Sequence, residues 1–350
     1  METRASTSLK HWFGIFQSQT FWQICKRLIP YLGSALILWL LLRQIGLQPV
    51  WELLVQVNGS PYTRGWLLAG FGWYLLTNVC RAYRFGVLLS LPGMVRPLRL
   101  VPDMIILSFL NNVLPARIGE LLFPLWLQRR HQTPIGQSLA LLLITRLFDF
   151  LAVAFLFLIF AFLVRGYLTA VARQVLLASI AILLPTLLLL ATLPWLGQRG
   201  LAFFDWLLSR LGLADHRFSQ RLRHLGERVV TAVVQVHQGR TYLKTFFWSL
   251  LAWLCTFAWF ASFLQAMALP TPYTFVVVGA TFAVLANAIP FITVGGFGAH
   301  DAGWAFGFSL FGMEWETAVA SGFAVNVLTV LASVISSGVL APFYLRKTGH

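Results

Sequence analysis

Apolar residues gather in continuous runs along this chain, each of about 20 residues or more, the length that a helix needs to cross a bilayer. Six of these runs predict membrane-spanning helices, at residues 28–47, 65–83, 134–164, 174–196, 245–267 and 317–340. The runs do not alternate with polar residues, as the strands of an outer-membrane barrel would. The pattern therefore predicts an all-α polytopic membrane protein.

Two further apolar regions, residues 100–128 and 274–312, are interrupted midway by proline or glycine. Each half has about 15 residues, which is too short to cross the hydrocarbon core alone. We therefore expect each region to be a re-entrant helical hairpin that enters and leaves on the same side of the membrane.

A short motif links the two hairpins. The stretch from Asn112 to Pro115 reads Asn-Val-Leu-Pro, and it recurs half a chain later, from Asn287 to Pro290, as Asn-Ala-Ile-Pro. Three expected spans accompany each hairpin, so the two halves would have opposite orientations in the membrane. Paired broken segments in inverted halves mark the binding site of many transporters, near the bilayer midplane.

The spans and hairpins give the expected domain organisation. It comprises a cytoplasmic N-terminal segment (1–27), a first membrane repeat (28–197), a basic amphipathic cytoplasmic connector (198–244), the remainder of the second repeat (245–341) and a cytoplasmic tail (342–350). The connector is expected to lie on the inner membrane surface, either as a solvated link or as a binding surface for anionic inner-leaflet lipids.

Composition supports a membrane protein, because 58% of the residues are hydrophobic and 11% are charged, against about 25% charged in soluble domains. The chain has 26 Lys and Arg but 11 Asp and Glu. The positive-inside rule explains this excess without a nucleic-acid partner. With both termini cytoplasmic, the outer side would hold only Arg43, Arg64, Arg165 and Arg173. Arg117 and Arg146 would stay in the membrane, and the remaining basic residues, Arg81 and Arg84 included, would lie on the inner side of the cytoplasmic membrane.

No cofactor or metal site is expected. The three cysteines lack the spacing of metal ligands. The glycine-rich stretch at Gly295, Gly296 and Gly298 lacks the Lys and Ser/Thr of a nucleotide-binding P-loop. These glycines are better explained by a tight helix break or a close backbone approach.

The charges expected at membrane depth form two pairs three residues apart: Arg117 with Glu120, and Arg146 with Asp149. Residues at this spacing share a helix face. Charged side chains in a membrane usually face the protein interior or a water-filled cavity. Two such pairs together predict a polar chamber. The alternative is a structural role, in which the ion pairs only tie a hairpin to the helix bundle.

A chamber with Arg117 and Arg146 suits an anionic headgroup, since guanidinium binds phosphate oxygens bidentately. The three acids Glu120, Asp149 and Asp301 could hold these arginines, receive a cationic headgroup or carry protons. Glu120 is the candidate for a gating or proton-linked acid, with Asp149 and Asp301 in support. The residues of the two breaks are supporting candidates: Asn112, Pro115, Gly119, Asn287, Pro290, Gly295, Gly296, Gly298 and His300. The asparagines are interpreted first as helix caps, and His300 as a packed histidine, with ligand binding as the alternative.

Three stretches, "NNVLPARIGELLFPL", "ITRLFDF" and "VGGFGAHDAGW", resemble the lysylphosphatidylglycerol synthase transmembrane-region family of flippase-like proteins, over the chain from about Leu28 onward. The resemblance implies movement of a phospholipid or other lipid-linked headgroup across the cytoplasmic membrane. Its motif residues are Arg117, Glu120, Arg146 and Asp149, and also Asp301, where the family typically has Glu. His300, Pro124 and Val294 depart from the family pattern, which allows a different headgroup preference.

The resemblance makes a lipid flippase or transporter the leading hypothesis. After residue 341 too little chain follows for the soluble aminoacyl-transfer domain of the full synthases, so synthesis of aminoacyl lipid is not expected. Two alternatives stay open: a membrane enzyme whose buried acids act as general acid and base, and a non-transporting scaffold of an envelope-synthesis complex. A homo-oligomer is compatible with each hypothesis.

Overall fold

The computed structural model describes residues 48–57, 59–89, 97–114, 118–131, 135–167, 170–210, 241–287 and 297–345. Helices and short turns account for the structure of these residues, with no strand among them. The expected span at 28–47, residues 211–240 of the connector, and the end of the tail lie outside the described residues.

Helices occupy each of the other expected spans. Their bounds are α3 Gln48–Gln56, α4 Pro61–Leu89, α5 Val101–Val113, α6 Ile118–His131, α7 Ile135–Val164, α8 Ala170–Arg210, α10 Thr241–Ala266, α11 Tyr273–Ala286, α12 Ala299–Ser309 and α13 Trp315–Leu345. Three of them, α7, α10 and α13, contain segments long and apolar enough to cross a membrane, at Leu141–Val164, Thr241–Ala266 and Trp315–Leu340. The all-α membrane class is thereby confirmed, whereas the number of six spans stays a prediction.

Several helices are longer than their apolar runs. Helix α4 continues past Tyr83 to Leu89, α8 continues past residue 196 to Arg210, and α13 continues to Leu345. Hydropathy marks only the apolar part of a helix, whereas its backbone hydrogen bonds can continue through polar residues as well. The connector and the tail predicted at 198 and 342 therefore begin within helices.

The two interrupted regions form pairs of short helices. In the first pair, α5 ends at Val113, and Leu114 leaves the helix with a ψ of 142° while its N–H donates to the Leu110 oxygen at 2.9 Å. In the second pair, α11 ends at Ala286, and α12 begins after Gly298, whose φ of 90° favours glycine. The breaks occur where the sequence predicts them, and re-entry from one side of the membrane stays a prediction.

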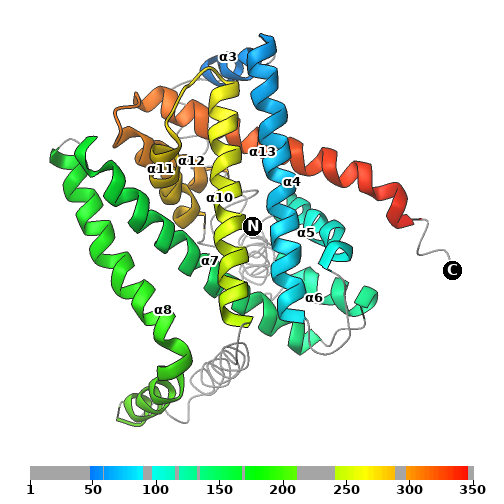
Figure 1. The fold of residues 1–350 in the computed structure, drawn as a ribbon, viewed down its shortest axis with the longest axis vertical. Coiled ribbons are helices and arrows are strands. Elements are labelled where there is room, and N and C mark those ends of the chain that lie inside the picture. Colours follow the sequence, from blue (N-terminus) through cyan, green and yellow to red (C-terminus); the bar gives the residue numbers. More distant parts are fainter. Residues whose placement is uncertain are drawn as a thin grey trace, which may run out of the picture.

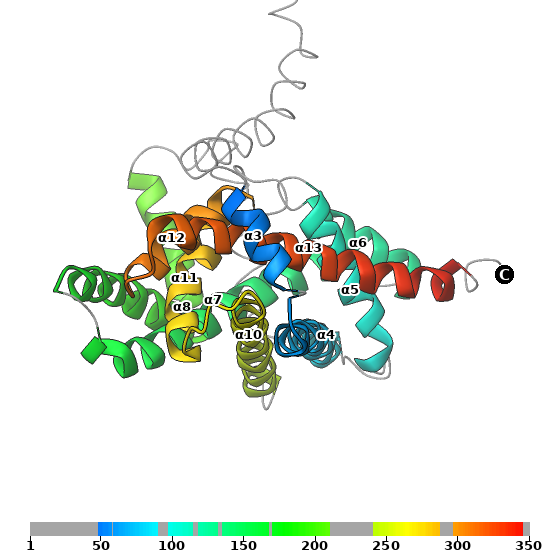
Figure 2. The ribbon, with the colours of Figure 1, turned by 90° about the horizontal axis from the view of Figure 1, so that it is seen from above.

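Helices α4 and α10 lie side by side through the middle of the molecule, with the first pair on one side and the second pair on the other (Figures 1 and 2). Helix α13 runs across behind them and contacts both α5 and α12. Aromatic side chains form much of the core between α10 and α12, where Phe260 packs edge-on against Trp304, with ring centroids 5.4 Å apart. The two pairs thus face a common centre bounded by α4, α10 and α13.

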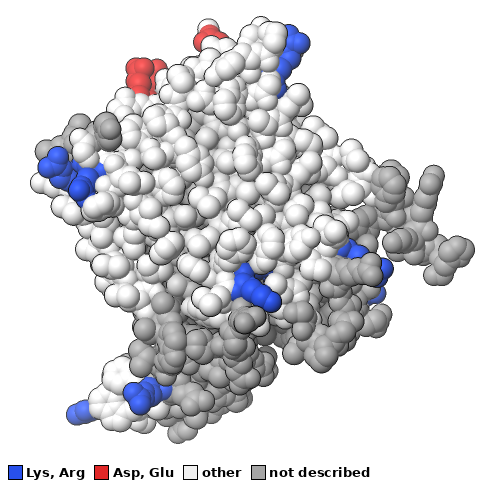
Figure 3. Space-filling view, viewed as in Figure 1, with Lys and Arg blue, Asp and Glu red and all other residues white. Residues whose placement is uncertain are grey.

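Much of the outer surface is apolar. Figure 3 shows a broad face with few charged atoms, with acidic residues at its upper edge. Large apolar side chains are exposed on several helices, for example Leu68 at 71%, Phe162 at 62% and Leu188 at 57%. Such a surface is uncommon on a soluble protein and is typical of a lipid-facing one.

Candidate functional site

A cavity of about 190 Å³ lies between the two pairs. Helix α4 lines it with Tyr74, Arg81 and Phe85, which recur at the spacing of one helix face. Trp253 of α10 and Asn326 of α13 also line it, and both lie near the middle of segments long enough to span a membrane. The cavity therefore lies at mid-height in these helices.

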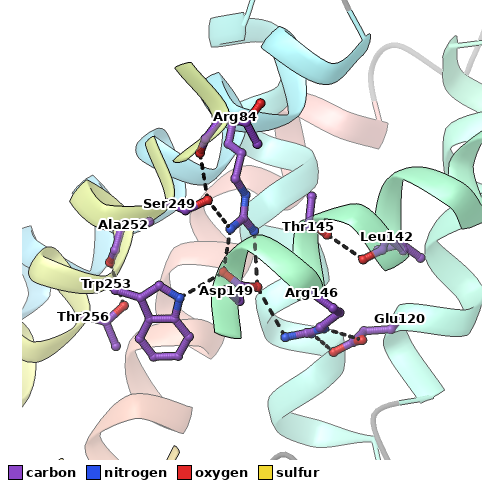
Figure 4. Close-up of polar contacts among 11 residues, drawn as sticks. Arg84, Glu120, Leu142, Thr145, Arg146, Asp149, Ser249, Ala252, Trp253 and Thr256 are labelled. Atoms are coloured by element: carbon purple, nitrogen blue, oxygen red, sulfur yellow. Dashed lines mark hydrogen bonds and ion pairs between the residues drawn. The ribbon is translucent and has the colours of Figure 1, made fainter. Parts of the chain in front are cut away.

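Ion pairs form a continuous chain along one wall of the cavity (Figure 4). Glu120 of α6 pairs with Arg146 of α7, and Arg146 Nε donates to Glu120 Oε2 at 3.0 Å. Arg146 Nη1 lies 3.6 Å from Asp149 Oδ2, one turn further along α7. Arg84 Nη1 of α4 then lies 2.5 Å from Asp149 Oδ1. The chain links α6, α7 and α4.

Asp149 is the centre of this chain. Besides the two arginines, it accepts a hydrogen bond from Trp253 Nε1 at 2.9 Å. Arg84 in turn donates from Nη1 to Ser249 Oγ at 3.1 Å. Through these bonds a single carboxylate joins α7 to α4 and to α10, so its charge is compensated from three directions (Figure 4).

Exposure changes along the chain of ion pairs. The side chain of Arg84 is 4% exposed and that of Asp149 is 15% exposed, whereas Arg146 reaches 37%. The Arg146–Glu120 pair therefore marks the accessible end of the cavity, and Arg84 marks its buried end.

Arg81 and Arg84 were not among the predicted site residues; they were expected on the inner side of the membrane, and this orientation stays a prediction. Both lie within α4 and line the cavity, and Arg84 is nearly fully buried. Arg81 Nη1 donates to Ser108 Oγ at 3.4 Å, and Ser108 donates to Asn78 Oδ1 at 2.7 Å. The helical spacing of Tyr74, Asn78 and Arg81 in an otherwise apolar segment was the sequence signal for this polar face.

The first pair places Glu120 at the start of α6, facing Arg146. Asn111 Nδ2 donates to Glu120 Oε1 at 3.5 Å, and its neighbour Asn112 lines the cavity from the last turn of α5. Gly119 allows the close approach of α6 to α5, because a Cβ there would lie 2.6 Å from Asn111 Oδ1. Pro115 and Arg117 lie outside the described residues, so the predicted pair of Arg117 with Glu120 stays a prediction.

The second pair places Asn287 and His300 on the cavity wall. Asn287 is the C-cap residue of α11, and its N–H donates to the Ala283 oxygen at 2.9 Å. His300 Nδ1 lies 3.3 Å from Asp301 Oδ1, and its ring stacks on that of Trp304. The histidine is thus both packed and lining the cavity.

Asp301 has a structural role in this arrangement. It is fully buried, and Asp301 Oδ2 accepts the Gly298 N–H at 3.0 Å, which caps the start of α12. It is not among the described residues that line the cavity. Pro290, Gly295 and Gly296 lie outside the described residues. Within the described part of the chain, no group of three or more His, Cys, Asp or Glu is arranged to hold a metal ion.

The cavity thus combines three arginines, two carboxylates and amide side chains from both pairs, inside a helical bundle with an apolar exterior. Such a chamber can receive a polar group while the rest of a lipid stays outside. Neither the curated proteins nor the solved structures contain a match to the chain. The family described as the lysylphosphatidylglycerol synthase TM region matches residues 27–337. Because this match covers most of the chain, the protein belongs to that family of membrane proteins of lipid-related processes.

Proposed function

We propose that the protein is a flippase or transporter that moves the headgroup of a phospholipid or lipid-linked molecule across the cytoplasmic membrane, with both termini on the cytoplasmic side. The observation that carries the proposal is the chain of ion pairs from Glu120 to Arg84 on the wall of a cavity that both helix pairs line. A polar headgroup would cross inside this cavity, and the acyl chains would stay in the bilayer.

The ion pair between Glu120 and Arg146 is the proposed gate. It lies at the accessible end of the cavity, and it joins α6 of a broken pair to α7, a helix of spanning length. An entering phosphate would compete with Glu120 for the Arg146 guanidinium, which binds either group bidentately. Exchange of one anionic partner for the other would keep Arg146 paired, and Glu120, the candidate proton-linked acid, would take up a proton from water as α6 separates from α7.

The same contacts favour transport over catalysis. A general acid or base must exchange protons with a substrate. Asp149 instead accepts bonds from two arginines and Trp253, and Glu120 is paired with Arg146. We therefore propose that these carboxylates organise the arginines and do not act on a bond of the substrate.

A reconstituted transport assay tests this proposal. Fluorescent phospholipid is placed in both leaflets of proteoliposomes, and a membrane-impermeant quencher reports how fast lipid in the inner leaflet becomes accessible. The wild type is expected to move lipid, and Glu120→Gln is expected to slow this movement at least about tenfold. The neutral amide cannot alternate with phosphate as the anionic partner of Arg146. Glu314→Gln, at an exposed position outside the cavity, serves as the matched control. Equal rates in protein-free and wild-type vesicles would remove the proposal.

A further inference from the structure

Four side chains on the cavity wall carry polar atoms that make no hydrogen bond, although each residue is more than nine-tenths buried. These atoms are Tyr74 Oη, Arg84 Nε, Trp259 Nε1 and Asn326 Nδ2, in residues that are 1%, 3%, 5% and 7% exposed. The Arg84 and Trp259 nitrogens can only donate. Buried polar groups are nearly always paired in native proteins. Unpaired donors gathered around one cavity therefore indicate a ligand that is rich in acceptors.

Arg81 is the lining arginine that makes no direct ion pair with a carboxylate among the described residues. Arg84 is paired with Asp149, and Arg146 is paired with Glu120 and Asp149. None of the carboxylates that the structure describes lies within 4.0 Å of Arg81, whose described hydrogen bond goes to the neutral Ser108 hydroxyl. Its guanidinium is thus available to an anion, and its planar donor pattern suits phosphate oxygens.

The carboxylates of the cavity are poorly suited to a cationic headgroup. Asp149 already accepts from two arginines and Trp253, and Glu120 is held by Arg146. An ammonium group would have to displace a guanidinium from either acid. With three arginines against two acids among the described lining residues, the cavity favours a net negative ligand.

Aromatic side chains line another part of the cavity. The rings of Tyr74 and Trp259 lie 4.8 Å apart, and Phe260 and His300 line the same region. Tyr74 precedes Arg81 by two helical turns, about 10 Å along α4. Tyr and Trp combine an apolar surface with a polar tip, which suits a group with both C–H faces and hydroxyls, such as a polyol or a sugar.

We propose, on the basis of the transport function above, that the cavity selects a lipid whose headgroup is an anionic phosphodiester with an uncharged, hydroxyl-bearing end. Arg81 binds the phosphate, and Tyr74, Trp259 and Asn326 bind the hydroxyls. A cavity of about 190 Å³ has room for such a headgroup, since a cavity of about 150 Å³ accommodates benzene. Lipids with a cationic headgroup bind more weakly.

Binding in detergent tests this selectivity without requiring transport. Short-chain phosphatidylglycerol, phosphatidic acid, phosphatidylcholine and lysylphosphatidylglycerol, all with the same acyl chains, are titrated against the purified protein, and the shift in Tm gives their relative affinities. Phosphatidylglycerol is expected to bind at least about tenfold more tightly than phosphatidylcholine, since the ammonium of phosphatidylcholine would enter a cavity with three arginines and two acids that are already paired. Phosphatidic acid, which lacks the polyol, ranks between them.

Two variants separate the phosphate and hydroxyl subsites. Arg81→Gln is expected to remove the preference for phosphatidylglycerol over phosphatidylcholine, and Arg81→Lys is expected to restore part of it. Trp259→Phe keeps the ring but removes the donor, so it should remove the advantage of phosphatidylglycerol over phosphatidic acid while leaving both above phosphatidylcholine. Arg64→Gln, at an exposed position on the same helix, is the control and should leave every ratio unchanged.

The outcomes distinguish this inference from the transport function. The inference is overturned if the wild type binds lysylphosphatidylglycerol as tightly as phosphatidylglycerol, or shows no preference among the lipids. It is also overturned if Arg81→Gln keeps the preference for phosphatidylglycerol over phosphatidylcholine. In each case, transport of lipid by the same protein would still stand. If glycerol 3-phosphate without acyl chains binds as tightly as phosphatidylglycerol, the chemistry of the cavity is supported, whereas the lipid function fails.

Discussion

The two helix pairs share a motif and a position beside the cavity, yet they differ in what holds them together. The first pair, α5 and α6, brings the charge of Glu120 to the accessible end of the cavity and pairs it with α7. The second pair, α11 and α12, brings uncharged Asn287 and the packed His300, and uses its acid, Asp301, to cap its own helix. The first pair thus presents its acid to the cavity, whereas the second pair uses its acid within its own helix.

Packing of the helices also differs between the two pairs. In the second pair, α12 lies directly on the backbone of α11: a Cβ at Gly303 would lie 2.6 Å from the Phe282 oxygen, and one at Gly307 would overlap the Gly279 carbonyl. In the first pair, a Cβ at Gly119 would lie 2.6 Å from Asn111 Oδ1, a side-chain atom that can rotate away, and 2.7 Å from Leu110 Cβ, which moves only with the backbone. The closest approach of one backbone to another is therefore in the second pair.

The largest effect is expected from Gly307→Leu, which places an isobutyl group against the Gly279 backbone. A backbone cannot rotate away as a side chain does, so the cost should exceed the usual 1–3 kcal/mol of overpacking, about 3 kcal/mol or more. We expect no monodisperse protein in gel filtration. Gly338→Leu, on α13 with no atom within 4 Å of the added Cβ, should behave as wild type. A well-folded Gly307→Leu would contradict the close packing of α12 on the backbone of α11.

The next effect is expected from Asp149→Asn at the centre of the ion-pair chain. The substitution keeps the size of the side chain but leaves Arg84, 4% exposed, without its anion. Removing one partner of a buried pair costs about 3–5 kcal/mol, so the Tm in detergent should fall by more than for any other substitution of a single cavity acid. Glu314→Gln is the exposed control. An unchanged Tm would show that the chain of ion pairs does not tie α7 to α4.

A smaller effect is expected from Gly119→Ala in the first pair. The added methyl meets Asn111 Oδ1 at 2.6 Å, which can rotate away, and Leu110 Cβ at 2.7 Å, which requires a small shift of α6 from α5. A stability loss of about 1–2 kcal/mol is expected, together with slower lipid movement, because Glu120 on the next residue is displaced from Arg146. Gly72→Ala, with open space around its Cβ, should change neither quantity. Transport at the wild-type rate would show that α6 tolerates displacement.

The smallest effect on stability is expected from Asp301→Asn, the counterpart of Glu120→Gln in the second pair. The amide oxygen can still accept the Gly298 N–H, so the loss is confined to the contact of the charge with His300 Nδ1 and to its interaction with the helix N-terminus, about 0.3–1 kcal/mol. Lipid movement should continue at the wild-type rate, whereas Glu120→Gln should slow it at least about tenfold at a similar Tm. If both substitutions abolish transport equally, the two pairs do not have different roles.

Much of this fold could be predicted from the sequence, because apolar runs and helix breaks are local signals. The breaks at Leu114 and Asn287 occur at the predicted positions, and Arg146 and Asp149, one turn apart, are paired in the structure. Arg84 could not be assigned in the same way, since its partner Asp149 lies 65 residues away. At the end of an apolar run, a basic residue fits a cytoplasmic loop equally well, so only the packing of α4 against α7 and α10 reveals its place.

The candidate site could be predicted only in part, again because local signals are evident in the sequence and contacts between distant residues are not. Glu120, Arg146 and Asp149 line the cavity, and Asn112, Asn287 and His300 join them there. Arg81 was not predicted as a site residue, because its polar helix face is evident only when Tyr74 and Asn78 are considered with it. Asp301 resembled a ligand-binding acid, yet its carboxylate caps α12, a role that depends on the local backbone conformation.

The most direct test of the account is to map where the headgroup contacts the protein in a bilayer. Phosphatidylglycerol with a photoreactive headgroup is reconstituted with the wild type and with Arg81→Gln, irradiated, and the adducts are located by mass spectrometry. The account predicts wild-type adducts on cavity residues such as Tyr74, Leu142 and Trp253, and their loss in Arg81→Gln. Adducts confined to lipid-facing residues such as Leu68 and Phe162, in both proteins alike, would contradict it.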